Sequence, residues 1–373
     1  MVGKTNLTFI SKGDASSVQL IQKSYATDAT GEIYKMEVIN NRFFAFVSAA
    51  ENGKKNVLMG TDVGNMSFVR KGNGYLEATH IIYIEESYYI VKSGDVCTEI
   101  FKTRDFDEYE QVNFIIDGNW LGIFLDSRER AILVSYDEKY AAWTRPIKIY
   151  ICDSLRDITN ATISAGVAEI ENDYNTCLLD NRIFFLDGRQ ISLAGEYITP
   201  EKGWKRCDYA GGYFFKVSHP VGGMVLYRSR DLKTITRYPG FFPNINDEAA
   251  VQMMLINGKY CLSYVAESDS KRYINIADDI LSVGQADNTK IEIADELKIV
   301  SVLEDDGKTY VGTSNGIIYE FQLDYEGTMQ RPDVAIIKTL AAKQALSQSM
   351  QYTDDCISKL KSYIDSKFED DST

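Results

Sequence analysis

Short apolar segments follow turn-forming dipeptides at regular intervals along this chain. Each segment is rich in aromatic or aliphatic residues, and the pair before it favours a tight turn, as expected for a strand entered through a hairpin. The seven copies start at Asn40, Glu86, Asp117, Asp180, Gly211, Asn257 and Asp306. From Phe44 to Tyr310 the six intervals average about 44 residues. The pattern therefore predicts a repeat protein built from strands.

A period of this size matches one four-stranded blade of a β-propeller. We predict an all-β, seven-bladed β-propeller over residues 1–330, with six or eight blades as alternatives. The last unit contains three evident strands at most, and propellers are commonly closed by strands from both ends of the chain. The alternating segment Leu7–Ile10 is our candidate for the closing strand.

A second repeat follows the strands of the first. Its copies follow one order of residue types: a small residue, a variable position, an aspartate, an apolar residue, two polar residues and a large apolar residue. An aspartate fits this position because its carboxylate can accept hydrogen bonds from backbone N–H groups two residues further on and so hold a turn. We predict structural turns at Asp62, Asp105, Asp231 and Asp279, with Ser154 in the aspartate position of a fifth copy.

This second repeat resembles the Asp-box, Ser-x-Asp-x-Gly-x-x-Trp, of sialidase-like β-propellers. The copy at Asp62 is the most similar because it keeps a glycine at Gly64 and an aromatic residue at Phe68. The resemblance covers about residues 30–325 and implies the fold, with the boxes as turns on the outside of the blades. Sialidases also carry an Arg-Ile-Pro motif before the first box, and nothing before Asp62 matches it. Sialidase activity is therefore not implied.

Residues 334–368 differ from the rest, because they contain no proline or glycine and are rich in helix-forming residues. Apolar residues recur there with the spacing 4-3-4-3-4, which is a short heptad seam. The seam consists of Leu346, Met350, Thr353, Ile357, Leu360 and Ile364. We predict an α-helical extension over 334–373 that carries assembly, by docking or as a coiled coil. Its partner could be a copy of itself, another protein or the propeller wall.

The net charge of −14 argues against nucleic acids and anionic membranes as main partners, since both require basic surfaces. No apolar run approaches the ~18 residues of a membrane span, and no signal-peptide pattern is visible, which favours synthesis in the cytoplasm. The six cysteines stand singly, so we expect buried free thiols and neither disulfides nor metal clips.

Few residues offer catalytic chemistry. His80 lies in an apolar run and is interpreted as a strand residue, and His219 lies in a turn-rich loop, so the two do not suggest a zinc site. No phosphate-binding or dinucleotide-binding motif is present. We expect no catalytic residue, no cofactor and no metal. The 54 acidic residues nevertheless leave open a carboxyl pair for glycoside hydrolysis.

These observations favour a non-catalytic propeller that binds other protein subunits through its C-terminal helix, with a homo-oligomer left open. A propeller joined to a heptad helix looks like a component of a phage or phage-tail-like particle, such as a baseplate, fibre or receptor-binding protein. Its propeller would then bind a cell-surface glycan or protein, and it would be found in the virion or tail particle. The alternative is a glycoside hydrolase of sialidase-like propeller type that acts on an extracellular glycan.

Overall fold

The computed structural model describes a defined part of the chain. The described residues are 16–25, 31–49, 55–92, 99–112, 119–136, 145–156, 161–168, 176–179, 181–185, 189–198, 208–210, 213–218, 225–231, 233–239, 251–256, 258–277, 280–284, 290–293 and 298–325. The chain divides into two compact units, Met1–Asp324 and Tyr325–Thr373. The predicted helix and all six residues of its seam lie outside the described residues.

The described residues form seven four-stranded sheets, which we number 1–7 in chain order. Sheet 1 comprises β2 (Gly31–Ile39), β3 (Arg42–Ala49), β4 (Lys55–Gly60) and β5 (Ser67–Phe68), and sheet 2 comprises β8 (His80–Ile84), β9 (Ser87–Lys92), β10 (Glu99–Thr103) and β11 (Glu110–Gln111). Sheet 3 comprises β12 (Asn119–Leu125), β13 (Ala131–Tyr136), β14 (Arg145–Cys152) and β15 (Thr162–Ala168). Sheet 4 comprises β16 (Thr176–Leu179), β17 (Arg182–Phe185), β18 (Gln190–Ser192) and β19 (Tyr197–Ile198). Sheet 5 comprises β20 (Asp208–Ala210), β21 (Tyr213–Ser218), β22 (Val225–Ser229) and β23 (Thr236–Pro239). Sheet 6 comprises β24 (Gln252–Ile256), β25 (Lys259–Val265), β26 (Arg272–Ala277) and β27 (Lys290–Ile293). Sheet 7 comprises β28 (Ile299–Asp305), β29 (Lys308–Thr313), β30 (Ile317–Tyr325) and β1 (Ser16–Tyr25).

Three small elements complete the described part. A short hairpin of β6 (Arg70–Lys71) and β7 (Gly74–Tyr75) lies between sheets 1 and 2 in the chain. A 3-10 turn, η1 (Val63–Asn65), follows β4, and the one-turn helix α1 (Ile280–Val283) follows β26. None of the described helices is long and apolar enough to cross a membrane.

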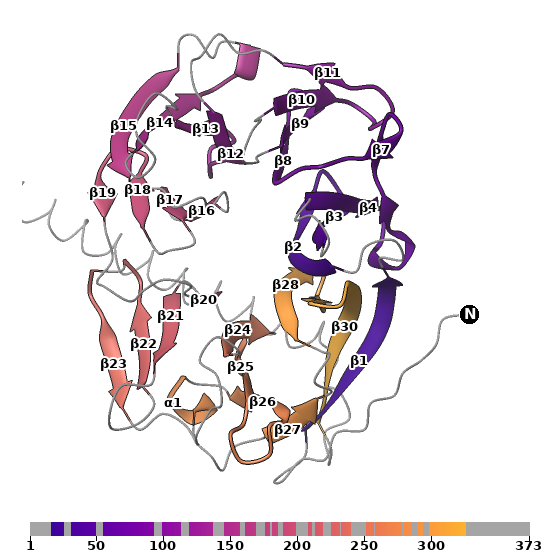
Figure 1. Ribbon diagram of the computed structural model, residues 1–373, viewed down its shortest axis with the longest axis vertical. Helices are drawn as coiled ribbons and strands as arrows, with labels where there is room; N and C mark the ends of the chain where they lie inside the picture. The colour runs from indigo at the N-terminus through magenta and orange to yellow at the C-terminus, as the bar shows by residue number, and fades with distance from the viewer. Residues whose placement is uncertain are drawn as a thin grey trace, which may run out of the picture. The chain divides into compact units, whose positions relative to one another are not determined.

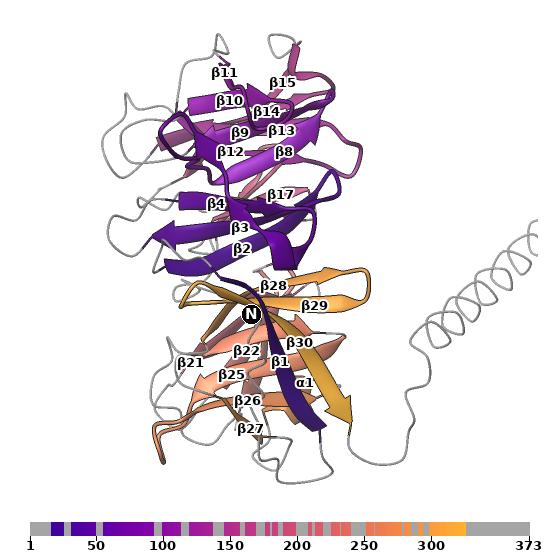
Figure 2. The same ribbon diagram turned by 90° about the vertical axis from the view of Figure 1, so that its right-hand side faces the viewer.

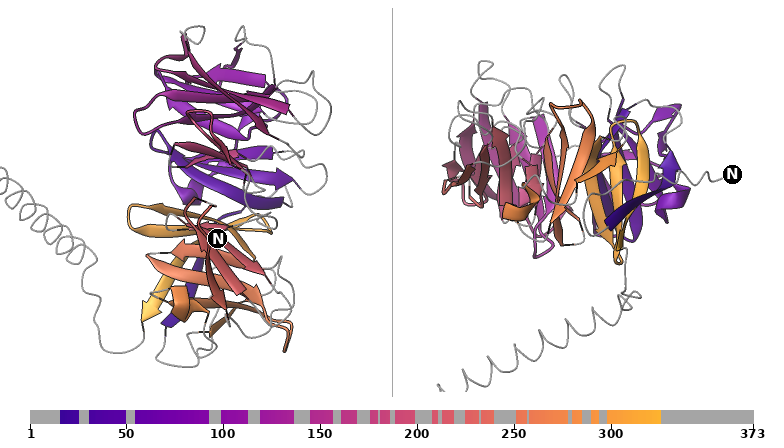
Figure 3. Two further views of the ribbon diagram at one scale, coloured as in Figure 1. Left: turned by 90° about the vertical axis from the view of Figure 1, so that its left-hand side faces the viewer. Right: turned by 90° about the horizontal axis from the view of Figure 1, so that it is seen from below.

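The seven sheets follow one another around a ring within the first unit (Figure 1). The first strand of a sheet contacts the first strand of the next in most steps: β2 with β8, β8 with β12, β12 with β16, β20 with β24, β24 with β28, and β28 with β2 again. Gln190 Nε2 of sheet 4 donates to the carbonyl oxygen of Asp231 in sheet 5 at 2.5 Å, which links the remaining pair. Neighbouring sheets pack face to face (Figures 2 and 3). This is a β-propeller arrangement with the seven units that the repeat predicts.

The core lies between the sheets. Six buried apolar clusters occur among the described residues, and each is shared by two consecutive sheets. In one of them, Phe44 and Phe46 of sheet 1 pack against Ile90 and Phe101 of sheet 2. Because a sheet is covered on both faces, its middle strands carry little polar surface, and every residue of β13 is buried.

Most of the predicted turns join the first and second strands of a sheet. Asn40 and Asn41 have φ values of 49° and 57°, and Asp306 and Gly307 have 44° and 73°. Two successive left-handed residues form the type I′ turn that matches the twist of a hairpin, and asparagine, aspartate and glycine tolerate it best. The turn dipeptides that recur in the sequence are therefore the hairpin signals of the blades.

The third unit differs from the prediction. Asp117 precedes β12, the first strand of sheet 3, so it does not lie between the first and second strands. The equivalent connection in this sheet is 126–130, between β12 and β13, and its left-handed residue is Glu129 with φ 60°. The left-handed position is a glutamate and not an asparagine, aspartate or glycine, so this connection lacks a hairpin signal of the expected kind.

Sheet 7 contains strands from both ends of the described chain. Its fourth strand is β1, which is hydrogen-bonded to β30 (Figure 2). The segment Leu7–Ile10, predicted for this role, lies outside the described residues. Sheet 7 also approaches sheet 1 closely: Ser301 Oγ donates to the carbonyl oxygen of Ile33. At Gly312 a Cβ atom would lie 2.5 Å from Ser301 Oγ and 2.7 Å from Ile33 Cγ2, so the contact requires glycine.

Candidate functional site

The predicted turn aspartates lie after the third strands of their sheets and hold local turns. Asp62 caps η1: its Oδ1 accepts the N–H of Gly64 at 2.9 Å, and its Oδ2 accepts Asn65 Nδ2 at 2.7 Å. Asp105 Oδ1 accepts the N–H of Asp107 at 3.0 Å, and that bond is the main reason why the pKa of Asp105 is lowered. Asp279 lies outside the described residues.

Asp231 makes the most extensive of these turns. Its Oδ1 accepts the N–H groups of Lys233 at 2.9 Å and Thr234 at 2.7 Å, and Ser229 Oγ donates to it at 3.1 Å. Burial acts to raise the pKa of Asp231, but these hydrogen bonds outweigh it and lower the pKa. In sheet 3, Ser154 Oγ takes the same place and accepts the N–H of Arg156 at 3.2 Å. Asp62, Asp105 and Asp231 therefore make these hydrogen bonds within their own turns.

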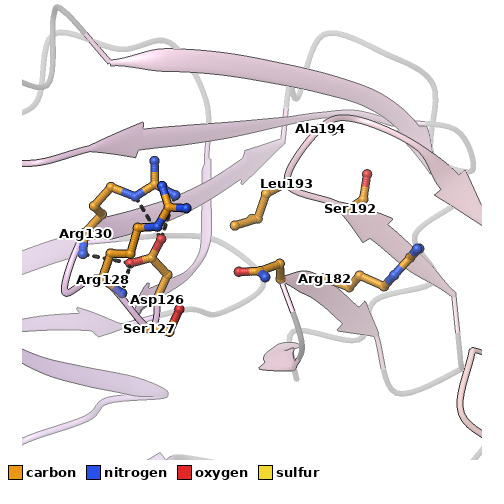
Figure 4. A pocket seen from close by; sticks show the side chains of 9 residues that line it. Asp126, Ser127, Arg128, Arg130, Arg182, Ser192, Leu193 and Ala194 are labelled. Atoms are coloured by element: carbon orange, nitrogen blue, oxygen red, sulfur yellow. Dashed lines mark hydrogen bonds and ion pairs between the residues drawn. The ribbon is translucent and has the colours of Figure 1, made fainter. Parts of the chain in front are cut away.

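A cavity of about 390 Å³ lies between sheets 3 and 4 (Figure 4). It is lined by the first-to-second connection of sheet 3 (126–130), by the same connection of sheet 4 (Asn181 and Arg182), and by the third-to-fourth connection of sheet 4 (192–194). In an antiparallel four-stranded sheet these two connections emerge on the same side. The strand order therefore brings three separate segments together on one face of the ring.

Asp126 organises the wall that sheet 3 contributes. The Asp126 side chain is 2% exposed, and its Oδ1 accepts the N–H groups of Arg128 and Arg130, both at 2.9 Å. Its Oδ2 accepts Arg130 Nε at 2.8 Å and lies 2.7 Å from Arg130 Nη2. Burial acts to raise the pKa of Asp126, but these donors outweigh it and hold the pKa below its ordinary value. The two oxygen atoms of the Asp126 carboxylate are therefore both occupied by N–H donors of Arg128 and Arg130.

Three arginines line the cavity, and the guanidinium group of Arg182 points away from those of Arg128 and Arg130 (Figure 4). Arg128 is exposed, and Arg130 is partly exposed and lies in the ion pair with Asp126 (Figure 4). Across the gap, Arg182 Nη1 is buried without a hydrogen-bond partner, and Arg182 Nη2 lies 3.8 Å from Glu196 Oε2. Lys233 Nζ donates to Glu196 Oε1 at 2.9 Å, and this bond is the main reason why the pKa of Glu196 is lowered. Glu196 thus neutralises Lys233 more than Arg182.

Backbone hydrogen bonds hold the wall that sheet 4 contributes. The N–H of Leu193 donates to the carbonyl oxygen of Asn181 at 3.0 Å, which joins the two connections of this sheet. Ser164 Oγ, from β15 of sheet 3, donates to the carbonyl oxygen of Leu193 at 2.5 Å. Beneath the cavity, Ile183 and Ile191 pack in one buried cluster with strands of sheet 3. The two walls are therefore fixed to each other.

This site is not predicted by the motifs of the sequence. Its signal is the run Asp126–Arg130, in which an aspartate and two arginines stand between the apolar strands β12 and β13. A charged run between two strands is ordinarily a solvated turn, and only the structure shows that it faces Arg182, more than 50 residues further on.

The remaining candidate residues are packed. His80 is buried at the start of β8, with Nδ1 3.0 Å from Thr79 Oγ1 and its ring edge-to-face with Phe124 at 4.9 Å. Cys152 and Cys261 are buried free thiols, and burial raises their pKa values to about 11 and about 12. His219 lies outside the described residues. No group of three His, Cys, Asp or Glu residues that could hold a metal occurs in the described part of the chain.

The depressed pKa of Asp126 predicts a specific pH dependence. Its contribution to stability is fully present above the pKa of an unfolded aspartate, about 3.9, and is lost as the pH falls through the lower folded value. We expect Asp126→Asn to lower the free energy of unfolding by about 2 kcal/mol at pH 7, because the ion pair with Arg130 is lost. Urea unfolding should show the same difference at pH 5 and a smaller one near pH 3.

The matched control for this prediction is Asp107→Asn, which removes one exposed carboxylate from a turn of sheet 2. Its unfolding curve should stay close to that of the native protein at every pH. A difference between native protein and Asp126→Asn that grows toward pH 3 would contradict the assigned direction.

Comparisons with known proteins support the fold. No family model matches the chain, and no curated protein matches its sequence. Among solved structures, the chain is similar to YCF48 bound to a D1 peptide, with a TM-score of 0.51, 10% identity, and 84% of this chain and 97% of that chain covered. It also matches BamB from Moraxella catarrhalis, with a TM-score of 0.43, 10% identity, and 87% and 99% of the two chains covered. At this identity the similarity to YCF48 shows a β-propeller fold and no particular function.

Proposed function

We propose that this chain is a non-catalytic β-propeller that binds a partner within a larger protein assembly. The observation that carries this proposal is the cavity between sheets 3 and 4, which presents the guanidinium groups of Arg128 and Arg130 beside a carboxylate that is already fully hydrogen-bonded (Figure 4). Guanidinium groups bind anionic groups strongly without reacting with them. The groups in this cavity are therefore suited to binding a ligand and not to reacting with it.

The same geometry counts against the glycosidase alternative at this place. Glycoside hydrolysis by the usual mechanisms requires two carboxyl groups across a cleft, one of them able to give up a proton. Asp126 is the single carboxylate among the residues that line the cavity, and its lowered pKa keeps it ionised. The lining also contains no histidine, cysteine or lysine that could serve as a base or nucleophile.

The assembly role rests on the heptad seam of residues 334–373. A lone helix gains most of its stability by burying such a stripe, so the stripe implies a surface that covers it. We propose that this segment docks the propeller into a phage or phage-tail-like particle as a baseplate, fibre or receptor-binding component. Thr353 weakens the seam as a self-sufficient coiled coil, which favours another protein subunit as the docking partner.

The docking role is tested by substitutions in the full chain. We expect Ile357→Glu to abolish incorporation into the particle, because it places a charge in the apolar seam. Ser358→Glu is the matched control, since it adds the same charge one residue outside the seam, and it should assemble normally. The measurement is sedimentation of particles from cells that express the neighbouring genes. Normal incorporation of Ile357→Glu would contradict the docking role.

Two further measurements bear on this proposal. Deleting residues 334–373 should leave a soluble, folded propeller, and an aggregated or unfolded product would mean that the segment belongs to the core of the propeller. Turnover of a chromogenic glycoside that is lost on a single acid-to-amide substitution would contradict the non-catalytic role and support the glycosidase alternative.

A further inference from the structure

We infer that the cavity between sheets 3 and 4 binds the carboxylate of a glutamate or aspartate side chain on a partner polypeptide. This inference rests on the proposed binding function and specifies the chemical class of its ligand. It is carried by the charge of the lining, by the unused donors of the arginines, and by the size and composition of the cavity.

The lining is locally basic in an acidic protein. It contains three arginines and one aspartate, whereas the whole chain has a net charge of −14. Charges are screened beyond roughly 10 Å at ordinary ionic strength, so a ligand inside the cavity responds mainly to the charged groups closest to it. The acidic surface of the chain already keeps it soluble, so solubility does not explain why arginines gather on two neighbouring sheets.

The arginines present donors that the protein does not use. Asp126 takes up Nε and Nη2 of Arg130 and, through its Oδ1, fixes the backbone of Arg128. The guanidinium group of Arg128 is exposed, and no partner of it is recorded among the described residues. The guanidinium group of Arg182 points away from Arg128 and Arg130 (Figure 4), and its buried Nη1 is not open to a ligand in the cavity, so Arg128 supplies the free donors. A carboxylate can accept two parallel N–H donors from one guanidinium group.

The cavity suits a peptide side chain better than a nucleic acid. A volume of about 390 Å³ accommodates one or two side chains, whereas a nucleic-acid backbone needs a basic track along several phosphates. No aromatic residue lines the cavity, so bases and sugar rings find no stacking surface. Leu193 lies opposite Arg128 and Arg130 (Figure 4) and can contact the methylene groups that precede a side-chain carboxylate.

The experiment measures peptide binding to the full chain by fluorescence anisotropy. The probe is a fluorescein-labelled peptide with four consecutive glutamates between glycines, and its matched peptide contains four glutamines instead. We expect the glutamate peptide to bind at least about tenfold more tightly, and its affinity to fall as NaCl is raised. Arg128→Gln, whose side chain is exposed and removable without loss of packing, should weaken binding about tenfold.

The matched control is Arg104→Gln, which removes an exposed arginine from a turn of sheet 2 and changes the net charge equally. Its affinity should stay within about twofold of the native value. Equal binding of the two peptides, no binding of the glutamate peptide, or no effect of Arg128→Gln would overturn the inference. Tighter binding of a phosphoserine peptide, of oligouridylate or of a glucuronate oligosaccharide would overturn the assignment to a side-chain carboxylate.

The two proposals fail separately. A chain that enters the particle through its C-terminal segment but does not bind the glutamate peptide refutes this inference alone. A chain that binds the peptide through Arg128, yet enters the particle equally well with Ile357→Glu, refutes the docking role alone.

Discussion

Deleting residues 1–25 is expected to destabilise the propeller strongly and to make it self-associate. The deletion removes β1, the fourth strand of sheet 7, and leaves β30 as an open edge. Loss of about five ladder hydrogen bonds at about 1 kcal/mol each would lower the melting temperature by about 10 °C or more. An unpaired edge strand also recruits other chains. Differential scanning calorimetry and light scattering measure the two effects.

A synthetic peptide with the sequence of residues 16–25 provides the control for this deletion. Added in excess, it should restore part of the lost melting temperature, whereas a scrambled peptide of the same composition should not. A truncated chain that stays monomeric and melts with the native protein would show that β1 contributes nothing to closure.

Phe44→Ala is expected to lower the free energy of unfolding by about 3–5 kcal/mol, as truncation of a fully buried aromatic residue does. Phe44 is 1% exposed and packs between sheets 1 and 2, with ring centroids 5.9 Å from Tyr88 and 5.7 Å from Phe106. The substitution therefore leaves a cavity in the contact between two blades. Equilibrium unfolding in urea measures the change.

The control is Phe68→Ala, which truncates the same residue type at a partly exposed position beside Tyr75. Its effect should be clearly smaller, because less apolar surface is withdrawn from water there. Equal losses for the two variants would mean that the clusters between sheets do not dominate the stability of the ring.

The fold was largely predictable because its hairpins need residues of a special kind. Two successive left-handed residues are tolerated by asparagine, aspartate and glycine, so Asn40-Asn41 and Asp306-Gly307 mark their hairpins in the sequence. The signal is weaker where glutamate adopts that conformation, although Glu85 and Glu86 do so in sheet 2 and that unit was placed correctly. Glu129 does so in sheet 3, and the unit was accordingly placed one strand too early.

The cavity was not predictable from the sequence. Asp126, Arg182 and Leu193 belong to three connections, and nothing in their sequence neighbourhood relates them. Their proximity follows from the direction of the strands and from the packing of sheet 3 on sheet 4, which are properties of the complete ring. The turn aspartates were accessible from the sequence because each makes its hydrogen bonds within its own few residues.

The meeting of the chain's two ends in sheet 7 has a consequence for the order of folding during synthesis. Among the strands that the structure describes, β1 is translated first and its neighbour β30 last, and the hydrogen bond between Ser301 and Ile33 joins residues 268 positions apart. Contacts of such long sequence separation form late and slowly. The nascent chain must therefore hold an unpaired first strand in solution while six sheets fold behind it, and this interval is when the protein is most exposed to misassembly.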